Sequence, residues 1–184
     1  MTIFATKHAV STAGPARGVT LIELMVGVAV LAVLLTLGLP SFQDQLASWR
    51  RDSAIQAFTN HVQIARTTAL RTSRPVVMCT SSDGQGCDNT ASTGDWRQTW
   101  LVFVDTNGNG GVDAGDRLVA VRAPQSGLDQ MAGNAARGRL AFRPSGLLAS
   151  GSTTITVVAS SATDNVSPIA IRVNTVGRVS VGMP

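Results

Sequence analysis

The residues best suited to bind a ligand lie in the stretch DTNGNGGVDAGD, residues 105–116. Oxygen-bearing side chains and one glycine occupy the places that carry ligands or the sharp turn in a twelve-residue calcium loop. In order along the chain these are Asp105, Asn107, Asn109, Gly110, Asp113 and Asp116. Strand-like segments flank the loop where helices are usual, and the last place holds Asp, whose side chain reaches less far than Glu. A Ca²⁺ site and a long hairpin loop both fit this composition, and we favour the hairpin loop.

Cys79 and Cys87 are the only cysteines, and seven residues rich in Ser, Gly and Asp separate them. If this part of the chain is exported, the oxidising compartment and the spacing predict a disulfide across a closed hairpin. Two thiolates without a nearby His make only half of a tetrahedral zinc site. The remaining alternative is a pair of free thiols.

Charge is unevenly distributed in the second half of the chain. Residues 83–129 contain seven acids and three Arg, a net charge of −4, whereas residues 130–184 contain five Arg and one acid, a net charge of +4. Arg143, Arg172 and Arg178 of the basic segment are candidates for contacts with DNA phosphates. They could equally face solvent or meet an acidic surface of another subunit. Residues 19–184 carry 13 Arg, no Lys and 11 acids, and this net charge of +2 is too small to indicate nucleic acid.

Catalytic chemistry has little support in the sequence. His61 is the only His after residue 18, and no nucleophile has a base at a spacing that would activate it. We therefore expect a protein that is not an enzyme and has no cofactor apart from the possible Ca²⁺.

Glu23 is the one charged residue in an otherwise apolar stretch. Residues 24–39 contain no charged side chain, and residues 19–39 would form a helix about 31 Å long, enough to cross a hydrocarbon core of about 30 Å. Lys7 and Arg17 precede the stretch without any acid, which predicts a cytoplasmic N-terminus and a translocated remainder. A carboxylate within a membrane span is costly, so Glu23 indicates a functional role with a partner.

One long helix and a group of strands must position these residues. After Pro40 apolar residues recur at steps of three and four as far as about Arg71, and the Arg74-Pro75 pair ends the helix. From Pro75 onward the period changes to two, in short Val-, Ile- and Thr-rich segments that indicate six to eight strands. The sequence predicts an α+β fold. Its long N-terminal helix has a transmembrane half (residues 19–40) and an amphipathic half (residues 41–74), and it packs on a C-terminal antiparallel β-sheet head (residues 75–184).

The stretch GVTLIELMVGVAVL resembles the class III leader and N-terminal helix of type IV pilins and type II secretion pseudopilins. The resemblance implies that residues 1–18 are a leader, which a prepilin peptidase removes by cutting between Gly18 and Val19 and then methylating the new amine of Val19. Glu23 would become the fifth residue of the mature chain. During assembly the new α-amine of one subunit could then neutralise Glu23 of a neighbour. The family usually has Phe or Met at the position of Val19.

The rest of the chain resembles the GspH/FimT family, on the segments GDWRQTWLVFVDTNGNGGVDAGDRLV, RLAFRPSGLL and IAIRVNTVGRVSV. The resemblance implies a minor pilin of a type IV pilus, of FimT/FimU type, or else the minor pseudopilin H of the type II secretion system. Implied partners are other pilins or pseudopilins, the prepilin peptidase and the inner membrane, with the head in the periplasm. Some FimT proteins bind DNA through a C-terminal Gly-Arg-x-Arg motif. Here residues 177–180 read GRVS, so the second Arg is missing.

Overall fold

The computed structural model describes residues 18–88, 94–133, 138–161 and 165–184, and the side chains of residues 36–41 lie outside this description. The leader expected over residues 1–18 is therefore outside it except for Gly18. The chain divides into two compact units, Met1–Leu39 and Pro40–Pro184.

Helix α1 (Leu21–Thr72) belongs to both units. Thr20 caps its start, because the Thr20 hydroxyl accepts a hydrogen bond from the backbone N–H of Glu23 at 3.3 Å. At the other end Ser73 adopts a φ of 52°, and the Arg74-Pro75 pair follows as expected. A transmembrane half was expected over residues 19–40, but none of the described helical residues form a stretch long and apolar enough to cross a membrane.

The N-terminal unit presents an unusual amount of apolar surface. Every large apolar side chain from Val19 to Leu35 is at least 51% exposed. Contiguous apolar exposure on this scale is typical of surfaces that contact a membrane or another protein.

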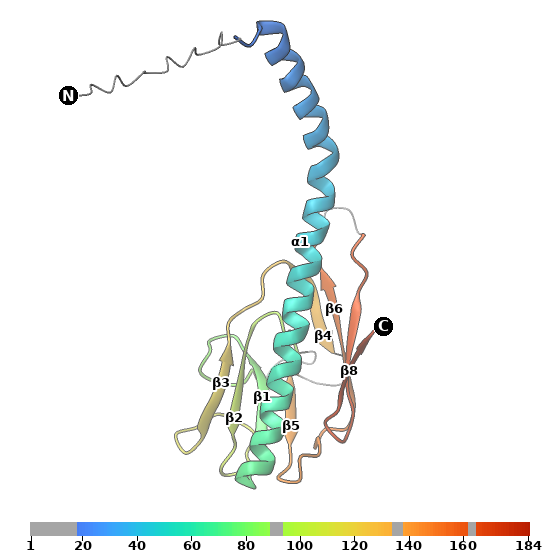
Figure 1. The fold of residues 1–184 in the computed structure, drawn as a ribbon. Coiled ribbons are helices and arrows are strands. Elements are labelled where there is room, and N and C mark those ends of the chain that lie inside the picture. Colours follow the sequence, from blue (N-terminus) through green and yellow to red (C-terminus); the bar gives the residue numbers. More distant parts are fainter. Residues whose placement is uncertain (1–17, 89–93, 134–137, 162–164) are drawn as a thin grey trace, which may run out of the picture. The chain divides into compact units, whose positions relative to one another are not determined.

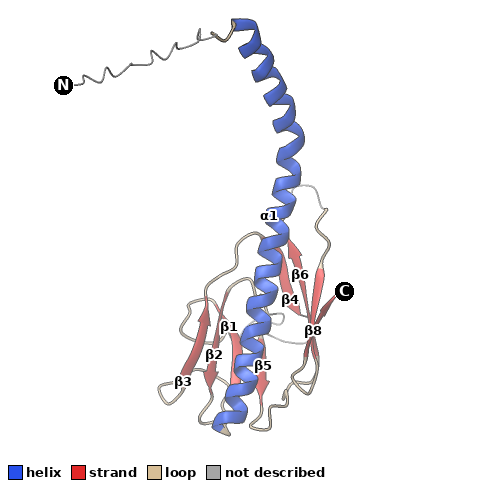
Figure 2. Ribbon diagram, viewed as in Figure 1, coloured by secondary structure: helices blue, strands red, loops and turns tan. Residues whose placement is uncertain are grey.

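The described residues of the Pro40–Pro184 unit form eight strands in two four-stranded antiparallel sheets beside the second half of α1 (Figures 1 and 2). Sheet A has the order β3-β2-β1-β5, formed by Arg117–Arg122, Thr99–Val104, Val76–Ser81 and Arg139–Phe142. Sheet B has the order β4-β6-β7-β8, formed by Leu128–Gly133, Thr153–Ala159, Ile169–Val173 and Val179–Gly182. The predicted α+β fold is confirmed, and the sequence pattern did not reveal that the strands divide between two sheets.

One apolar core holds the helix on both sheets. Phe58 of α1 is completely buried, and its ring centroid lies 5.0 Å from that of Trp96 and 6.0 Å from that of Trp100, both in edge-on contact. The same core includes Met78 of sheet A and Ile171 of sheet B. Because all described buried apolar residues lie between Ala47 and Val173, the core belongs entirely to the Pro40–Pro184 unit.

Two aromatic residues of the helical stripe are not in this core. Phe42 is 63% exposed and Trp49 is 58% exposed. They precede the buried Phe58 by 16 and nine residues, which at about 100° per residue places them on the opposite side of the helix. The steps of three and four therefore predicted the helix correctly, but Phe42 and Trp49 lie on a different helix face from the later positions, which the sheets bury.

Sheet A has a second, smaller apolar cluster formed by Val77, Cys79, Leu101 and Phe103. In the β1 and β2 strands these residues alternate with members of the main core, so they lie on the face of sheet A away from α1. Cys87 and Val112 pack against the cluster. Loops 82–88 and 105–116, which carry these two residues, therefore cover the outer face of sheet A.

Candidate functional site

Gly18, Val19 and Glu23 stand at the start of α1, where the sequence places the cleavage site and the assembly carboxylate. Gly18 and Val19 precede the helix and are exposed, as an accessible cleavage site requires. Glu23 is exposed in the first helical turn, where the helix dipole favours a negative charge. Within the described part of the chain, no group forms an ion pair with its carboxylate.

The predicted disulfide is confirmed, with Cys79 of β1 bonded to Cys87 across a Cα–Cα distance of 5.6 Å. Hydrogen bonds shape the loop that it closes. Asp83 accepts from the backbone N–H groups of Gln85 (2.8 Å) and Gly86 (3.1 Å), and these bonds hold the pKa of its carboxyl below the ordinary value. Asp88 accepts from the N–H and the hydroxyl of Ser82. The disulfide and these hydrogen bonds together hold the loop in one conformation.

Removing this disulfide should destabilise the head. Replacing both Cys79 and Cys87 by Ala opens a short loop, and we expect the free energy of unfolding to fall by about 2–3 kcal/mol. Denaturant unfolding of the variant beside the wild-type protein, with and without a reducing agent, measures the effect. Reduction should lower the wild-type midpoint and leave the variant unchanged. Equal midpoints for all four samples would show that the bond contributes nothing to stability.

The predicted calcium-loop residues lie together in the β2–β3 connection, but their carboxylates are occupied by N–H groups of the loop. Asp105 is 3% exposed and accepts from the backbone N–H groups of Gly108 and Gly110, both at 2.8 Å. Asp113 accepts from the side-chain amides of Asn107 (2.6 Å) and Asn109 (2.9 Å).

The last carboxylate of this loop has the same kind of partners, because Asp116 accepts from the backbone N–H groups of Thr106 (2.8 Å) and Asp113 (3.1 Å). Among the described residues no three His, Cys, Asp or Glu side chains are arranged to hold a metal ion. The loop hydrogen bonds are those of a hairpin built on Asn and Asp turns, the interpretation favoured above.

Calcium titration tests the alternative. Binding Ca²⁺ through these carboxylates would require the loop to give up its internal hydrogen bonds, so we expect no heat of binding by calorimetry and no change in melting temperature on adding Ca²⁺. A saturable heat with a rise in melting temperature, both lost in Asp113→Ala, would establish the calcium site.

The three arginines considered for DNA contacts lie in two places. Arg143 follows β5, Arg178 precedes β8, and the two turns are joined by a hydrogen bond from the N–H of Leu148 to the carbonyl of Thr175 (2.8 Å). Arg172 lies on β7, where its guanidinium donates to the carbonyl of Met183 (3.1 Å). The structure therefore brings Arg143 and Arg178 to one end of the head and leaves Arg172 outside this pair.

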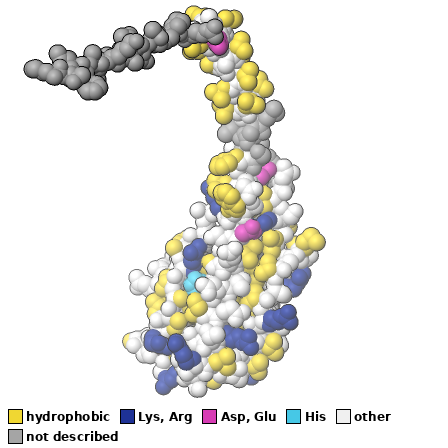
Figure 3. Space-filling view, in the orientation of Figure 1, with side chains coloured by type: hydrophobic (Ala, Val, Ile, Leu, Met, Phe, Trp, Pro, Cys, Tyr) yellow, Lys and Arg dark blue, Asp and Glu magenta, His cyan; other side chains and the backbone are white. Residues whose placement is uncertain are grey.

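The end of α1 adds arginines that sequence reasoning did not connect with this site. Gly146 and Gly177 have φ angles of 74° and 72°, and their tight turns lie directly against Leu70 and Arg66 of the helix. Arg71 and Arg74 follow Leu70 at the helix end. We call the resulting set the arginine surface, and Figure 3 shows arginines gathered over this end of the head. It consists of Arg66, Arg71, Arg74, Arg143 and Arg178.

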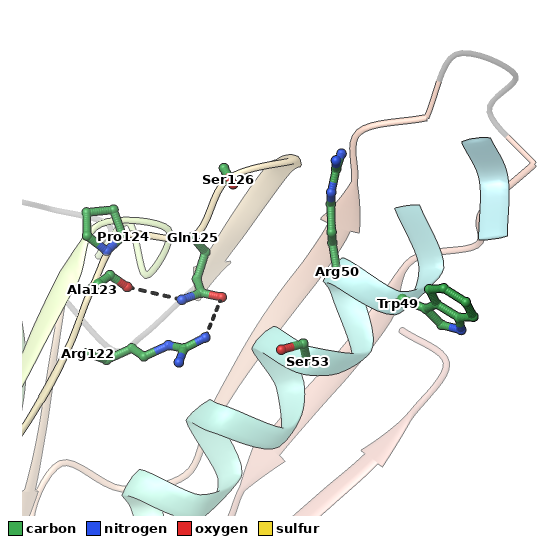
Figure 4. A pocket seen from close by; sticks show the side chains of 8 residues that line it. All are labelled: Trp49, Arg50, Ser53, Arg122, Ala123, Pro124, Gln125 and Ser126. Atoms are coloured by element: carbon green, nitrogen blue, oxygen red, sulfur yellow. Dashed lines mark hydrogen bonds between the residues drawn. The ribbon is translucent and has the colours of Figure 1, made fainter. Parts of the chain in front are cut away.

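A groove of about 420 Å³ separates the α1 residues Trp49, Arg50 and Ser53 from the connection between β3 and β4, and Figure 4 shows the side chains that line it. Gln125 fixes the far wall by donating to the carbonyl of Ala123 (3.0 Å) and accepting from Arg122 (3.1 Å). No sequence motif pointed to this groove.

Two family profiles match the chain. The profile described as Type II transport protein GspH matches residues 54–177, which include the later part of α1 and most of the head. The chain belongs to the GspH family. A second profile, the prokaryotic N-terminal methylation motif, matches residues 15–39 and so includes Gly18, Val19 and Glu23. A GspH head thus follows a methylation motif in one chain.

The GspH-family head has the fold of a solved minor pilin. The chain is similar to the type IV minor pilin FimU of Pseudomonas aeruginosa strain PAO1, with a TM-score of 0.54 and 17% identity over 71% of this chain and 87% of that chain. A second crystal form of FimU gives a TM-score of 0.53 and 18% identity over 71% and 91% of the two chains. No curated protein sequence matches. The family and fold are those of structural pilin subunits.

Proposed function

We propose that this protein is a minor pilin that takes part in the assembly or initiation of a type IV pilus, as a subunit of FimT/FimU type. The observation that carries the proposal is the N-terminal methylation motif at residues 15–39 joined to a GspH head with the fold of FimU. The protein acts by packing and docking, in keeping with the structural role of its family.

In this proposal the prepilin peptidase cuts between Gly18 and Val19 and methylates the amine of Val19. Residues 19–40 anchor the chain in the inner membrane with the leader in the cytoplasm and the head in the periplasm. The exposed apolar side chains between Val19 and Leu35 support this proposal, because lipid or neighbouring helices would cover them. Lipid surrounds them before assembly, and the helices of other pilins replace the lipid in the filament.

Glu23 has a defined part in the movement of the N-terminal helix from lipid into the filament. A carboxylate among apolar helices is stabilised only when a cation meets it. The α-amine of Val19 exists only after cleavage, so the ion pair between subunits links processing to assembly. An unprocessed subunit lacks the amine and cannot supply the pair.

The alternative is a minor pseudopilin H of the type II secretion system, which shares the family, leader and helix. A deletion strain separates the two functions. Our proposal predicts loss of twitching motility with normal exoprotein secretion, restored by the wild-type gene. Loss of secretion with normal twitching would assign the protein to the secretion system.

A pilus-tip DNA receptor is a further alternative, and it depends on the arginines near the C-terminal end of the chain. The arginine surface contains Arg143 and Arg178, whereas Arg172 lies elsewhere and the family's second motif Arg is replaced by Ser180. Gel-shift titration at low and moderate salt tests this alternative. Absence of binding even at low salt would exclude it, since phosphate contacts are strongest there.

A further inference from the structure

The groove between α1 and the connection from β3 to β4 carries two arginines from parts of the chain that are distant in sequence. Arg50 belongs to the helix, and Arg122 is the last residue of β3. In Figure 4 the guanidinium of Arg122 faces the helix across the groove, and Arg50 projects from the helix on the opposite side. Ser53 and Ser126 add hydroxyl groups to the lining. The groove therefore presents positive charge and hydrogen-bond donors from both sides.

Contacts within the head hold the stems of both arginines. Arg50 lies across Gly127, because a side-chain carbon placed on Gly127 would come within 2.6 Å of the Cδ of Arg50. Arg122 donates to the side-chain oxygen of Gln125 at 3.1 Å, and its Nε is buried without a hydrogen-bond partner among the described residues. Side chains that are positioned before a ligand arrives lose little conformational entropy on binding.

No acidic side chain in the described part of the chain forms an ion pair with Arg50 or Arg122. Two ion pairs are found there, and they join Arg51 to Asp52 and Arg97 to Asp95. Guanidinium groups bind phosphates and carboxylates through paired N–H donors, and these charge-assisted hydrogen bonds are strong. The groove is therefore suited to an anionic group.

Exposed aromatic side chains on α1 adjoin the groove. Phe42 and Trp49 are 63% and 58% exposed, and their spacing of seven residues, at about 100° per residue, places them on one face of the helix. Trp49 also belongs to the groove lining and immediately precedes Arg50. Trp is enriched where a membrane meets water, because its ring is apolar and its N–H is polar. An apolar face and a cationic groove thus meet on the same stretch of helix.

We propose that this groove binds the phosphate headgroup of an anionic phospholipid. The phosphate lies between the guanidinium groups of Arg50 and Arg122, and the glycerol and acyl chains contact Phe42 and Trp49. Charge complementarity requires an anion, and the exposed aromatic face favours one that carries hydrocarbon. The inference rests on the proposed membrane anchor at residues 19–40, which brings lipid to this helix. It holds equally for a pilus or a pseudopilus.

Native mass spectrometry of the full-length protein in a nonionic detergent tests the proposal, because it counts the lipids that stay bound to each subunit. The probes are phosphatidylglycerol and phosphatidylcholine with the same acyl chains, so only the headgroup differs. We expect one phosphatidylglycerol per subunit. It should bind about tenfold or more tightly than phosphatidylcholine, because the arginines repel the choline cation.

Three variants locate the bound lipid. Arg50→Gln with Arg122→Gln removes both charges and should weaken binding of phosphatidylglycerol about tenfold or more. Ser53→Phe fills the groove, keeps both arginines and should also weaken binding. The control variant Arg71→Gln with Arg74→Gln makes the same charge change at the other end of α1 and should bind as the wild-type protein does. Circular dichroism and melting temperature establish that each variant is folded.

Equal affinity for the two lipids, or an equal loss of binding in the control variant, would overturn the proposal. Displacement of the lipid by inorganic phosphate at the same concentration would assign the groove to a free anion. If the Arg50 and Arg122 substitutions left lipid binding unchanged and lowered incorporation into filaments, the groove would bind an acidic side chain of another subunit.

Flotation of the full-length protein with phosphatidylcholine vesicles reports on the membrane anchor separately from the groove. Flotation without any preference for phosphatidylglycerol in detergent would overturn the headgroup site and leave the anchor intact. Binding of phosphatidylglycerol in detergent without flotation would support the headgroup site and contradict the anchor.

Discussion

Replacing Glu23 by Ala is expected to leave cleavage after Gly18 intact and to abolish incorporation of the subunit into filaments. Cleavage requires access to the bond between Gly18 and Val19, both of which are exposed and lie outside the helix. In the proposed assembly step, incorporation requires a charge partner for the new amine of Val19 in apolar surroundings, where an unpaired charge costs several kcal/mol. The measurement is immunodetection of the subunit in sheared filaments, with the mass of the cellular protein as the check on processing.

Two control variants separate the ion pair from the helix cap. Glu23→Gln preserves the size of the side chain and removes its charge, so it should fail in the same way as Glu23→Ala. Thr20→Val removes the hydroxyl that accepts from the N–H of Glu23, which costs about 1 kcal/mol of helix stability, and should allow substantial incorporation. If Thr20→Val failed as completely as the Glu23 variants, capping of α1 would explain the result better than the ion pair.

Phe58→Ala is expected to destabilise the head by about 3–5 kcal/mol, a large part of the stability of a typical domain. Phe58 has no exposed surface, and its ring contacts Trp96 and Trp100 at the centre of the main core. Truncation leaves a cavity that neither indole can fill without losing its own contacts. Denaturant unfolding, followed by tryptophan fluorescence, measures the change in free energy.

Phe42→Ala is the matched control, because it makes the same chemical change on the same helix at a residue that is 63% exposed. It should alter the free energy of unfolding by no more than about 0.5 kcal/mol. Similar effects for the two variants would contradict the division of the helical stripe into a buried and an exposed part.

Much of the fold follows from sequence periodicity, because helices and strands bury their apolar residues at different spacings. The change of period after Pro75 predicted the strands, and the stripe that includes Phe58 predicted the helix. The exposure of Phe42 and Trp49 follows from the same geometry, because both lie on the helix face opposite Phe58. The step of six residues from Trp49 to Ile55 interrupts the helical period, and the sequence interpretation did not take account of it.

Some candidate sites could likewise be predicted from the sequence, and others could not. The Cys79–Cys87 bond depends on short-range spacing, which the sequence displays directly. The arginine surface depends on which turns meet the end of α1. That meeting results from the pairing of strands in sheets A and B and from the close approach of Gly177 to Arg66. No local pattern carries such information, so the charges of helix and turns appeared unrelated along the chain.

The loop at residues 105–116 shows how a ligand motif can also be a structural motif. Asp and Asn are frequent in calcium loops because their oxygens bind cations, and frequent in turns because the same oxygens accept backbone N–H groups. At Asp105 the acceptors are directed at Gly108 and Gly110. Sequence spacing alone could not distinguish these two uses of one carboxylate.

The mass of the mature protein tests the proposed function most directly. Intact-mass spectrometry of the subunit, isolated from cells with an active prepilin peptidase, should give the mass of residues 19–184 with one disulfide and one added methyl group. Fragmentation should place the methyl group on the amine of Val19. A subunit that retained residues 1–18 in those cells would contradict the account, because the amine proposed to pair with Glu23 would not exist.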